Sequence, residues 1–173
     1  MEVRDATLDD LPGILEIFNA AIVNTTAVWR DAPEDLATRR RWFEARVSRQ
    51  FPVLVAAEDE QVLGFGSYGD FRMFDGYRHT VEHSVYIRGD RRRAGLGRAL
   101  LQALIEHARA HRMHAMIGGI EASNHASLAL HAALGFREVA RMPEVGCKFG
   151  RWLDLVFVQL LLDSRATPAT SGV

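Results

Sequence analysis

The stretch "IRGDRRRAGLGRALLQAL", Ile87 to Leu104, joins an apolar strand pattern to a helix pattern through a basic segment that contains two glycines. The first turn of a helix leaves backbone N–H groups unpaired, and the helix dipole is positive there, so such a turn binds anions. Gly95 and Gly97 allow the backbone to approach a bulky anion closely. Three arginines add positive charge: Arg92, Arg93 and Arg98. The stretch therefore predicts a phosphate or pyrophosphate site.

Two common phosphate-binding motifs do not fit this stretch. A P-loop needs Lys and then Ser or Thr after its last glycine, whereas Gly97 is followed by Arg98 and Ala99. A dinucleotide fingerprint needs a small residue three positions after its second glycine, where this chain has Leu100. A solvated arginine turn before an amphipathic helix remains the alternative to an anion site.

The composition indicates one globular domain and narrows its partners. The chain has 173 residues, of which 48% are hydrophobic and 25% charged. Its formal net charge of −1 gives no overall attraction to nucleic acid or to an anionic membrane, so we expect neither as a partner. Cys147 is the only cysteine, and the acidic N-terminus has no apolar signal core, so we expect a cytoplasmic protein. His107 and His111 have metal-binding spacing, but no further ligand completes a site, and we expect no metal.

Local patterns predict an α/β domain over residues 1–163, followed by a small, polar and flexible tail over 164–173. Strands and helices are expected in the order β-α-α-β-β-β-α-β-α-β-β, which indicates a mixed central sheet. The expected strands cover 2–7, 52–58, 61–71, 79–87, 114–121 and, as a pair, 137–162; the helices begin near 9, 33, 95 and 124. In the second helix, 33–49, we expect the arginines at 39–41 on a solvated face, and Leu36, Trp42, Phe43 and Val47 are its apolar residues. We expect His79 and His83 to be loop-edge and packing residues.

Two motifs carry a resemblance to a known family. The segment "RRAGLG", Arg92 to Gly97, matches the Arg/Gln-x-x-Gly-x-Gly/Ala signature of the GCN5-related N-acetyltransferases (GNAT), and it follows a strand and opens a helix as in that family. The run "NHASLALHAALGF", Asn124 to Phe136, resembles the second conserved block of the family, and the order of elements agrees over residues 2–162. Within the superfamily, the chain is most similar to the phosphinothricin and methionine sulfoximine/sulfone acetyltransferases, through "IVNTTAVWR", "GYRHTVEHSVYI", "HAALGF" and "KFGRWLDLVFVQ".

The resemblance implies the GNAT fold, in which acetyl-CoA lies between two splayed parallel strands. Here these are the strand ending at Ile87 and the strand beginning at His114. Backbone groups of the first strand are then expected to hold the pantetheine arm, and the glycine segment is expected to wrap the pyrophosphate. The cofactor-binding residues expected on this basis are Val85, Tyr86, Ile87, Arg92, Arg93, Ala94, Gly95, Leu96, Gly97, Arg98 and Asn124.

Acetyl transfer to an amine needs a base near the acceptor and, in many cases, an acid near the leaving thiolate. Glu82 is the candidate base, because it lies in the middle of an apolar strand where burial would raise its pKa. The alternative is a glutamate that pairs with a nearby arginine. His131 stands where the family often has a tyrosine acid; it can transfer a proton, or orient the substrate or Glu82. Tyr86 is a weaker alternative acid.

The loop "RMFDGYR", residues 72–78, is the candidate acceptor-binding segment. Its arginines can bind a carboxylate or phosphinate in bidentate fashion, and its aromatic residues can form a pocket wall with Trp29. The alternatives are solvated loop charges and ordinary core packing. The substrate-binding residues expected are Trp29, Arg72, Met73, Phe74, Tyr77, Arg78 and Glu82.

By resemblance, the expected activity is direct acetyl transfer from acetyl-CoA to the α-amine of a small amino-acid analogue: methionine sulfoximine, methionine sulfone or phosphinothricin. A homodimer is expected on the same ground. One alternative is a GNAT enzyme for another amine, such as a protein N-terminus, a polyamine or an aminoglycoside. The other is a non-catalytic acyl-CoA-binding module, against which the presence of Glu82 and His131 argues.

Overall fold

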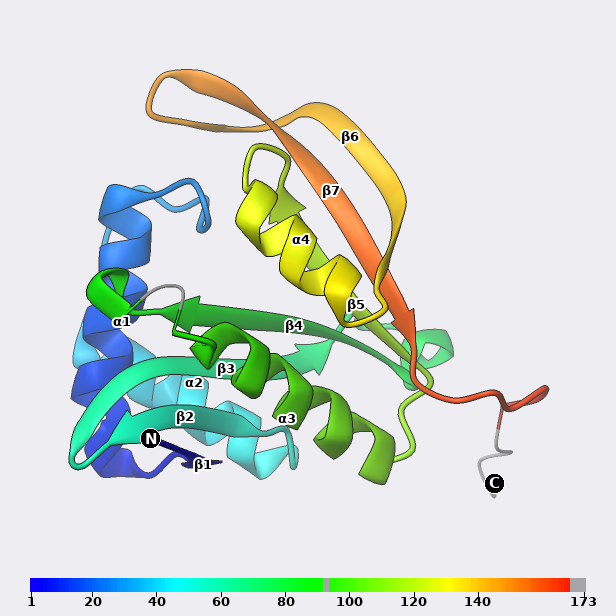
Figure 1. Cartoon of the computed structure of the whole chain (residues 1–173), viewed down its shortest axis with the longest axis horizontal. Helices are drawn as coiled ribbons and strands as arrows, with labels where there is room; N and C mark the ends of the chain where they lie inside the picture. The colour runs from blue at the N-terminus through cyan, green and yellow to red at the C-terminus, as the bar shows by residue number, and fades with distance from the viewer. Residues whose placement is uncertain (92–93, 169–173) are drawn as a thin grey trace.

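The computed structural model describes residues 1–91 and 94–168, which form an α/β fold around one mixed sheet (Figure 1). In this part of the chain, seven strands follow the order β1-β2-β3-β4-β5-β7-β6 across the sheet. The strands are β1 Glu2–Asp5, β2 Val53–Glu58, β3 Gln61–Asp70, β4 Thr80–Ile87, β5 Ala115–Glu121, β6 Arg137–Lys148 and β7 Arg151–Leu161. The helices are α1 Leu11–Asn24, α2 Leu36–Ser48, α3 Leu96–Ala110 and α4 His125–Ala133. The order of elements predicted from the sequence is confirmed.

Strand β4 lies where the sheet divides. On one edge it pairs antiparallel with β3, from Val81 opposite Asp70 to Ile87 opposite Gly64. On its other edge it runs parallel to β5, and the described pairs extend only from Thr80–Ala115 to His83–Gly118. Strand β5 pairs with β7 along its whole length. Strands β4 and β5 therefore separate after His83, which confirms the splayed parallel pair predicted from the sequence.

The helices pack on opposite faces of the sheet, with α3 in front of it and α1 and α2 behind it in Figure 1. Side chains alternate along β4, so Val85 packs with the α3 core whereas Tyr86 packs with the core under α1 and α2. Leu100 and Leu104 of α3 are fully buried. Truncating a buried leucine to alanine typically costs about 2–5 kcal/mol, so these contacts hold the start of α3 firmly beside β4.

Helix α2 differs from its prediction in the side chains that it buries. Arg39 is 2% exposed, its guanidinium lies 3.9 Å from the centroid of the Phe18 ring, and it pairs with Glu34 at 2.6 Å. Leu36 and Val47, which are apolar, are exposed. The prediction of a solvated face is therefore wrong for Arg39. A guanidinium can be buried where a carboxylate pairs with it and aromatic faces surround it.

The chain leaves the sheet after β7 and continues along the surface. Arg165 donates to the carboxylate of Asp163 at 2.6 Å and to the carbonyl of Arg112 at 2.8 Å. These bonds attach the described beginning of the predicted tail to the segment between α3 and β5. No helix within residues 1–91 and 94–168 has the length and apolar character needed to cross a membrane.

Candidate active site

The gap between β4 and β5 exposes backbone groups at the end of β4. Val85, Tyr86 and Ile87 pair with β3 on one edge, and no described strand pairs with them on the other edge. An open strand edge presents alternating N–H and C=O groups, which can bind an extended ligand that contains amides. This arrangement fits the pantetheine arm expected there.

The start of α3 lies just beyond this open edge. Gly95 is the N-cap residue and has a φ of 79°, a left-handed conformation that favours glycine. A Cβ atom at Gly97 would lie 3.3 Å from Cδ2 of Leu130, so this glycine allows α3 and α4 to approach each other. Of the other residues expected here, Leu96 is buried, Ala94 and Arg98 are exposed, and Arg92 and Arg93 lie outside the described residues.

Helix α4 follows β5, the strand on the other side of this gap. The side-chain oxygen of Asn124, the N-cap residue, accepts a hydrogen bond from the N–H of Ser127 at 3.2 Å. The cap uses the amide oxygen and leaves the NH₂ group available as a donor. A pocket between α1 and the end of β4 adjoins the gap on the face of the sheet opposite α4. Ile17, Ala21 and Ile87 are among the residues that line it.

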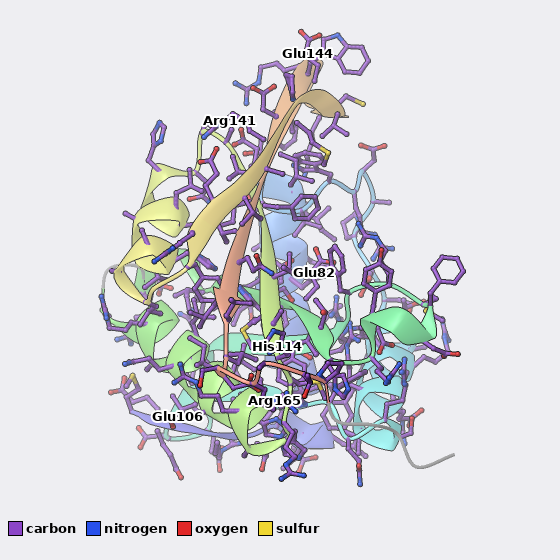
Figure 2. The ribbon with its side chains drawn as sticks, turned by 90° about the vertical axis from the view of Figure 1, so that its right-hand side faces the viewer. Glu82, Glu106, His114, Arg141, Glu144 and Arg165 are labelled. Carbon is purple, nitrogen blue, oxygen red and sulfur yellow. The ribbon has the colours of Figure 1, made fainter. Side chains whose placement is uncertain are left out.

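Glu82 projects from β4 toward β5. A Cβ atom at Gly119 would lie 3.4 Å from Oε1 of Glu82, so glycine makes room for the carboxylate beside β5. The side chain is 36% exposed, and Oε2 lies 3.8 Å from Nη1 of Arg72. Burial raises the pKa of Glu82, and the charge of Arg72 partly offsets that rise. Figure 2 shows Glu82 near the middle of the molecule, well below Glu144 at the far end of the β6–β7 hairpin. A half-buried carboxylate with a raised pKa is chemically suited to act as a base.

The segment after β3 adds an arginine and an aromatic cluster on the same side. The guanidinium of Arg72 lies 4.1 Å from the centroid of the Phe71 ring, which meets the rings of Tyr77 and Phe157 edge-on. Three other residues expected to bind substrate lie at the surface: Arg78 donates to the carbonyl of Asp75 in its own turn, and Met73 and Phe74 are 86% and 79% exposed. The fold thus brings Arg72 close to Glu82, and Tyr77 packs edge-on against the Phe71 ring beside Arg72.

Trp29 reaches this side from the loop between α1 and α2. Its Nε1 donates to the carbonyl of Thr26 at 2.8 Å. Its ring packs on β6 at Gly146, where an added Cβ would come within 2.1 Å of the indole. The Trp29 ring is therefore positioned by its own loop and by the β6 backbone.

Glu121, at the end of β5, is a buried carboxylate that sequence analysis did not single out. It accepts hydrogen bonds from the hydroxyl of Thr26 and from the N–H of Ser123, each at 2.9 Å. Burial opposes ionisation, but the hydrogen bonds from the hydroxyl and N–H of Ser123 and from Thr26 outweigh it and lower the pKa of Glu121. A single acidic residue at a strand end has no distinctive local pattern, so its partners became visible only in three dimensions.

His131 of α4 faces His83 of β4 on the other face of the sheet. The carbonyl oxygen of Ser127 lies 2.7 Å from Nδ1 of His131, so this nitrogen donates and Nε2 carries no proton in the neutral ring. The two Nε2 atoms are 3.2 Å apart in stacked rings, which makes the His83 nitrogen the donor. Burial lowers the pKa of both rings, to about 3 for His83. The pair is therefore neutral at pH 7.

The two candidate catalytic residues are on opposite sides of β4. Glu82 and His83 are adjacent in the strand, so their side chains point to opposite faces. Within the described part of the chain, Glu82 interacts with Arg72, whereas His131 hydrogen-bonds to Ser127 and His83. A group that lies in the gap would thus meet a carboxylate on one side and a neutral histidine pair on the other.

Comparison with known proteins places this geometry in a family. The model of the acetyltransferase (GNAT) family matches residues 14–136. The L-methionine sulfoximine/L-methionine sulfone acetyltransferase of Pseudomonas aeruginosa is 56% identical over 96% of this chain and 98% of that protein. The structure of yncA from Salmonella typhimurium with its cofactor acetyl-CoA has a TM-score of 0.96 and 49% identity, covering 98% of each chain. A phosphinothricin acetyltransferase from Sinorhizobium meliloti in complex with acetyl-CoA has a TM-score of 0.95 and 36% identity, covering 99% of this chain and 94% of that one. This chain belongs to the GNAT family of acetyltransferases.

Proposed function

We propose that this acetyltransferase moves the acetyl group of acetyl-CoA directly to the α-amine of a small amino-acid analogue. L-methionine sulfoximine, L-methionine sulfone and phosphinothricin are the proposed acceptors. The observation that carries the proposal is half-buried Glu82, 3.8 Å from Arg72, beside the gap between β4 and β5. The 56% identity to the methionine sulfoximine/sulfone acetyltransferase supports the choice of acceptor.

Bound acetyl-CoA supplies the acetyl thioester for this reaction. The open backbone edge of Val85–Ile87 is suited to its pantetheine amides, and the first turn of α3 to its pyrophosphate. Glu82 accepts a proton from the ammonium group of the acceptor, which generates the neutral amine needed for attack. A raised carboxylate pKa favours this transfer because the base is closer in strength to the amine.

Arg72 binds the acidic end of the acceptor. A guanidinium matches the paired oxygens of a carboxylate or phosphinate, and the Phe71 ring supports its flat face. The same positive charge acts on Glu82 and keeps its pKa from rising further. Arg72 therefore has two functions in this proposal: it orients the acceptor and it limits the basicity of Glu82.

His131 serves the leaving-group side of the gap. In the neutral ring Nδ1 donates to the Ser127 carbonyl and Nε2 accepts from His83, so in this state the ring has no proton to give to the thiolate. In this proposal, His131 orients the groups in the gap, and the leaving thiolate takes the proton that the attacking amine loses as the amide forms. No metal takes part.

The test is a panel of amines incubated with acetyl-CoA, in which free thiol is measured. The panel contains the three analogues, a peptide with a free N-terminus, a polyamine and an aminoglycoside. We expect turnover with the analogues, and a loss of at least tenfold in Arg72→Met but not in Arg141→Met, an exposed arginine of β6. Turnover confined to the other amines would reject the acceptor assignment.

We further propose that the enzyme is a cytoplasmic homodimer that needs neither nucleic acid nor a membrane. Exposed apolar side chains on the β6–β7 hairpin support an interface there: Val139, Val145, Phe149 and Trp152. Light scattering is expected to give the mass of two chains for the wild type and of one chain for Trp152→Glu. A wild type that stays monomeric at micromolar concentration would reject the dimer, and recovery outside the cytoplasmic fraction would reject the location.

A further inference from the structure

Lys148, the only lysine of the chain, is 5% exposed at the end of β6. Its ammonium donates to three backbone carbonyls, those of Ile22, Thr25 and Val28. An ammonium has three N–H donors, so these contacts use all of them. The side chain is therefore fully committed to binding backbone at the end of α1 and just after it.

These carbonyls need a partner. The last turn of a helix leaves carbonyls unpaired, and the helix dipole is negative there, so a cation is favoured. The hydroxyl of Thr25 binds the carbonyl of Ala21 at 2.6 Å, and Lys148 binds that of Ile22. The other two carbonyls that Lys148 binds, those of Thr25 and Val28, belong to the segment that follows α1. Lys148 thus joins the tip of the β6–β7 hairpin to a segment more than 100 residues away.

The segment Thr25–Trp29, called here the 25–29 loop, is held at two more points. The hydroxyl of Thr26 donates to buried Glu121 at the end of β5. The Trp29 ring lies against the backbone of β6 at Gly146. The loop is therefore attached to β5 through Thr26 and to β6 at two places, Gly146 and Lys148.

The 25–29 loop lies on the Glu82 side of the gap. Gly119 adjoins the Glu82 carboxylate, and Glu121 is the next residue on the same face of β5. A step of two residues along a strand is about 6.5–7 Å. The loop therefore stands roughly one amino-acid length beyond the candidate base, where it forms the end wall of the space beside Glu82.

We propose that Lys148 is a positioning residue for the acceptor site: by binding three carbonyls it holds the 25–29 loop, and with it Trp29, as the end wall beside Glu82. The inference rests on the proposed function, because it assigns the loop to the acceptor. Misplacing a substrate-positioning group by about 1 Å can reduce catalysis as much as 100-fold, so a distant lysine can control acceptor binding through this loop. The groups proposed to bind acetyl-CoA, at the end of β4 and at the start of α3, are not part of this loop, so acetyl-CoA binding is expected to change little.

The test compares Lys148→Met with Arg141→Met, which removes one positive charge from an exposed site on the same strand. The KM for methionine sulfone is expected to rise about tenfold in Lys148→Met, while the KM for acetyl-CoA changes less than twofold. Arg141→Met should change neither. A purely structural role would lower the amount of folded enzyme and therefore kcat, with both KM values unchanged, and that result would overturn the inference.

A second variant covers the case in which Lys148→Met does not fold. Thr26→Val keeps the shape of the side chain and removes the bond to Glu121, and we expect it to raise the acceptor KM about threefold, a loss of roughly 0.65 kcal/mol in binding. An unchanged acceptor KM in Thr26→Val, when Lys148→Met is unfolded, would overturn the inference. Failure of the wild type to acetylate methionine sulfone would instead reject the proposed function and this inference together.

Discussion

The two sides of the gap between β4 and β5 are constructed differently. The proposed cofactor side comes mainly from residues 85–91 and 94–98, and its principal groups are backbone N–H and C=O. The proposed acceptor side combines side chains from separate parts of the chain: Trp29, Arg72, Glu82, Glu121 and Lys148.

This difference shows which kind of site a local pattern can specify. A backbone site needs a strand end, a helix start and a glycine where a left-handed φ or a close approach occurs, all within a few residues. A side-chain site needs groups that only packing brings together. Substitutions on the proposed cofactor side should therefore abolish acetyl-CoA binding. Substitutions on the proposed acceptor side should instead alter the rate, the acceptor affinity or the pH dependence.

The strongest test of the cofactor side is Gly97→Asp. The new side chain would crowd Leu130 and place a negative charge at the proposed pyrophosphate site, so acetyl-CoA affinity should fall at least about 100-fold. Calorimetric titration measures the affinity, and circular dichroism checks the fold. Gln102→Asp, with the same charge change on the exposed face of α3, is the matched control and should bind normally. Intact binding by folded Gly97→Asp would refute the pyrophosphate assignment.

On the acceptor side, Glu82→Gln should lower kcat about 100-fold, because it removes the base without changing its size. The carboxylate is the active form and burial raises its pKa, so wild-type kcat/KM should fall as the pH drops through a value above that of an ordinary glutamate. Glu82→Gln should lack this acidic limb. Arg72→Met should move the limb to higher pH, since the charge of Arg72 lowers the pKa of Glu82.

A pH–rate profile from pH 4.5 to 9 measures both effects. Glu106→Gln, on the exposed surface of α3, is the control and should match the wild type. An acidic limb that persists in Glu82→Gln would assign the base to another group and would remove Glu82 from the acceptor side.

Substitution of Arg39 is expected to affect acetyl-CoA binding least. The contacts of this residue are structural, so its substitution should change stability instead. Arg39→Met leaves the buried carboxylate of Glu34 with only half-exposed Arg30 as its ionic partner and removes the guanidinium from the Phe18 ring, so the free energy of unfolding should fall by about 3 kcal/mol. Arg40→Met removes an exposed pair on the same helix and should cost less than about 0.5 kcal/mol. Urea unfolding measures both. Equal values would show that Arg39 behaves as a surface residue in solution.

The sequence predicted the fold and the start of α3 more completely than the contacts around Glu82. Periodicity placed every helix and strand in the correct order, and the glycine pattern marked the start of α3. Burial of Arg39 was missed because three consecutive arginines are typical of a solvated helix face, whereas the aromatic rings around it come from other elements. The link between His83 and His131 was missed for a similar reason: these residues are 48 positions apart.

Local sequence was sufficient for the α/β architecture and for the glycine-capped start of α3, because both depend on residues within one or two turns or strand steps of each other. Tertiary packing assigned the partners of Glu82, the position of Trp29 and the environment of Lys148. Lys148 illustrates the physical reason. Its three carbonyl partners are 120 to 126 positions away, and a lone lysine in a strand has no local signal that distinguishes a buried helix cap from a solvated surface charge.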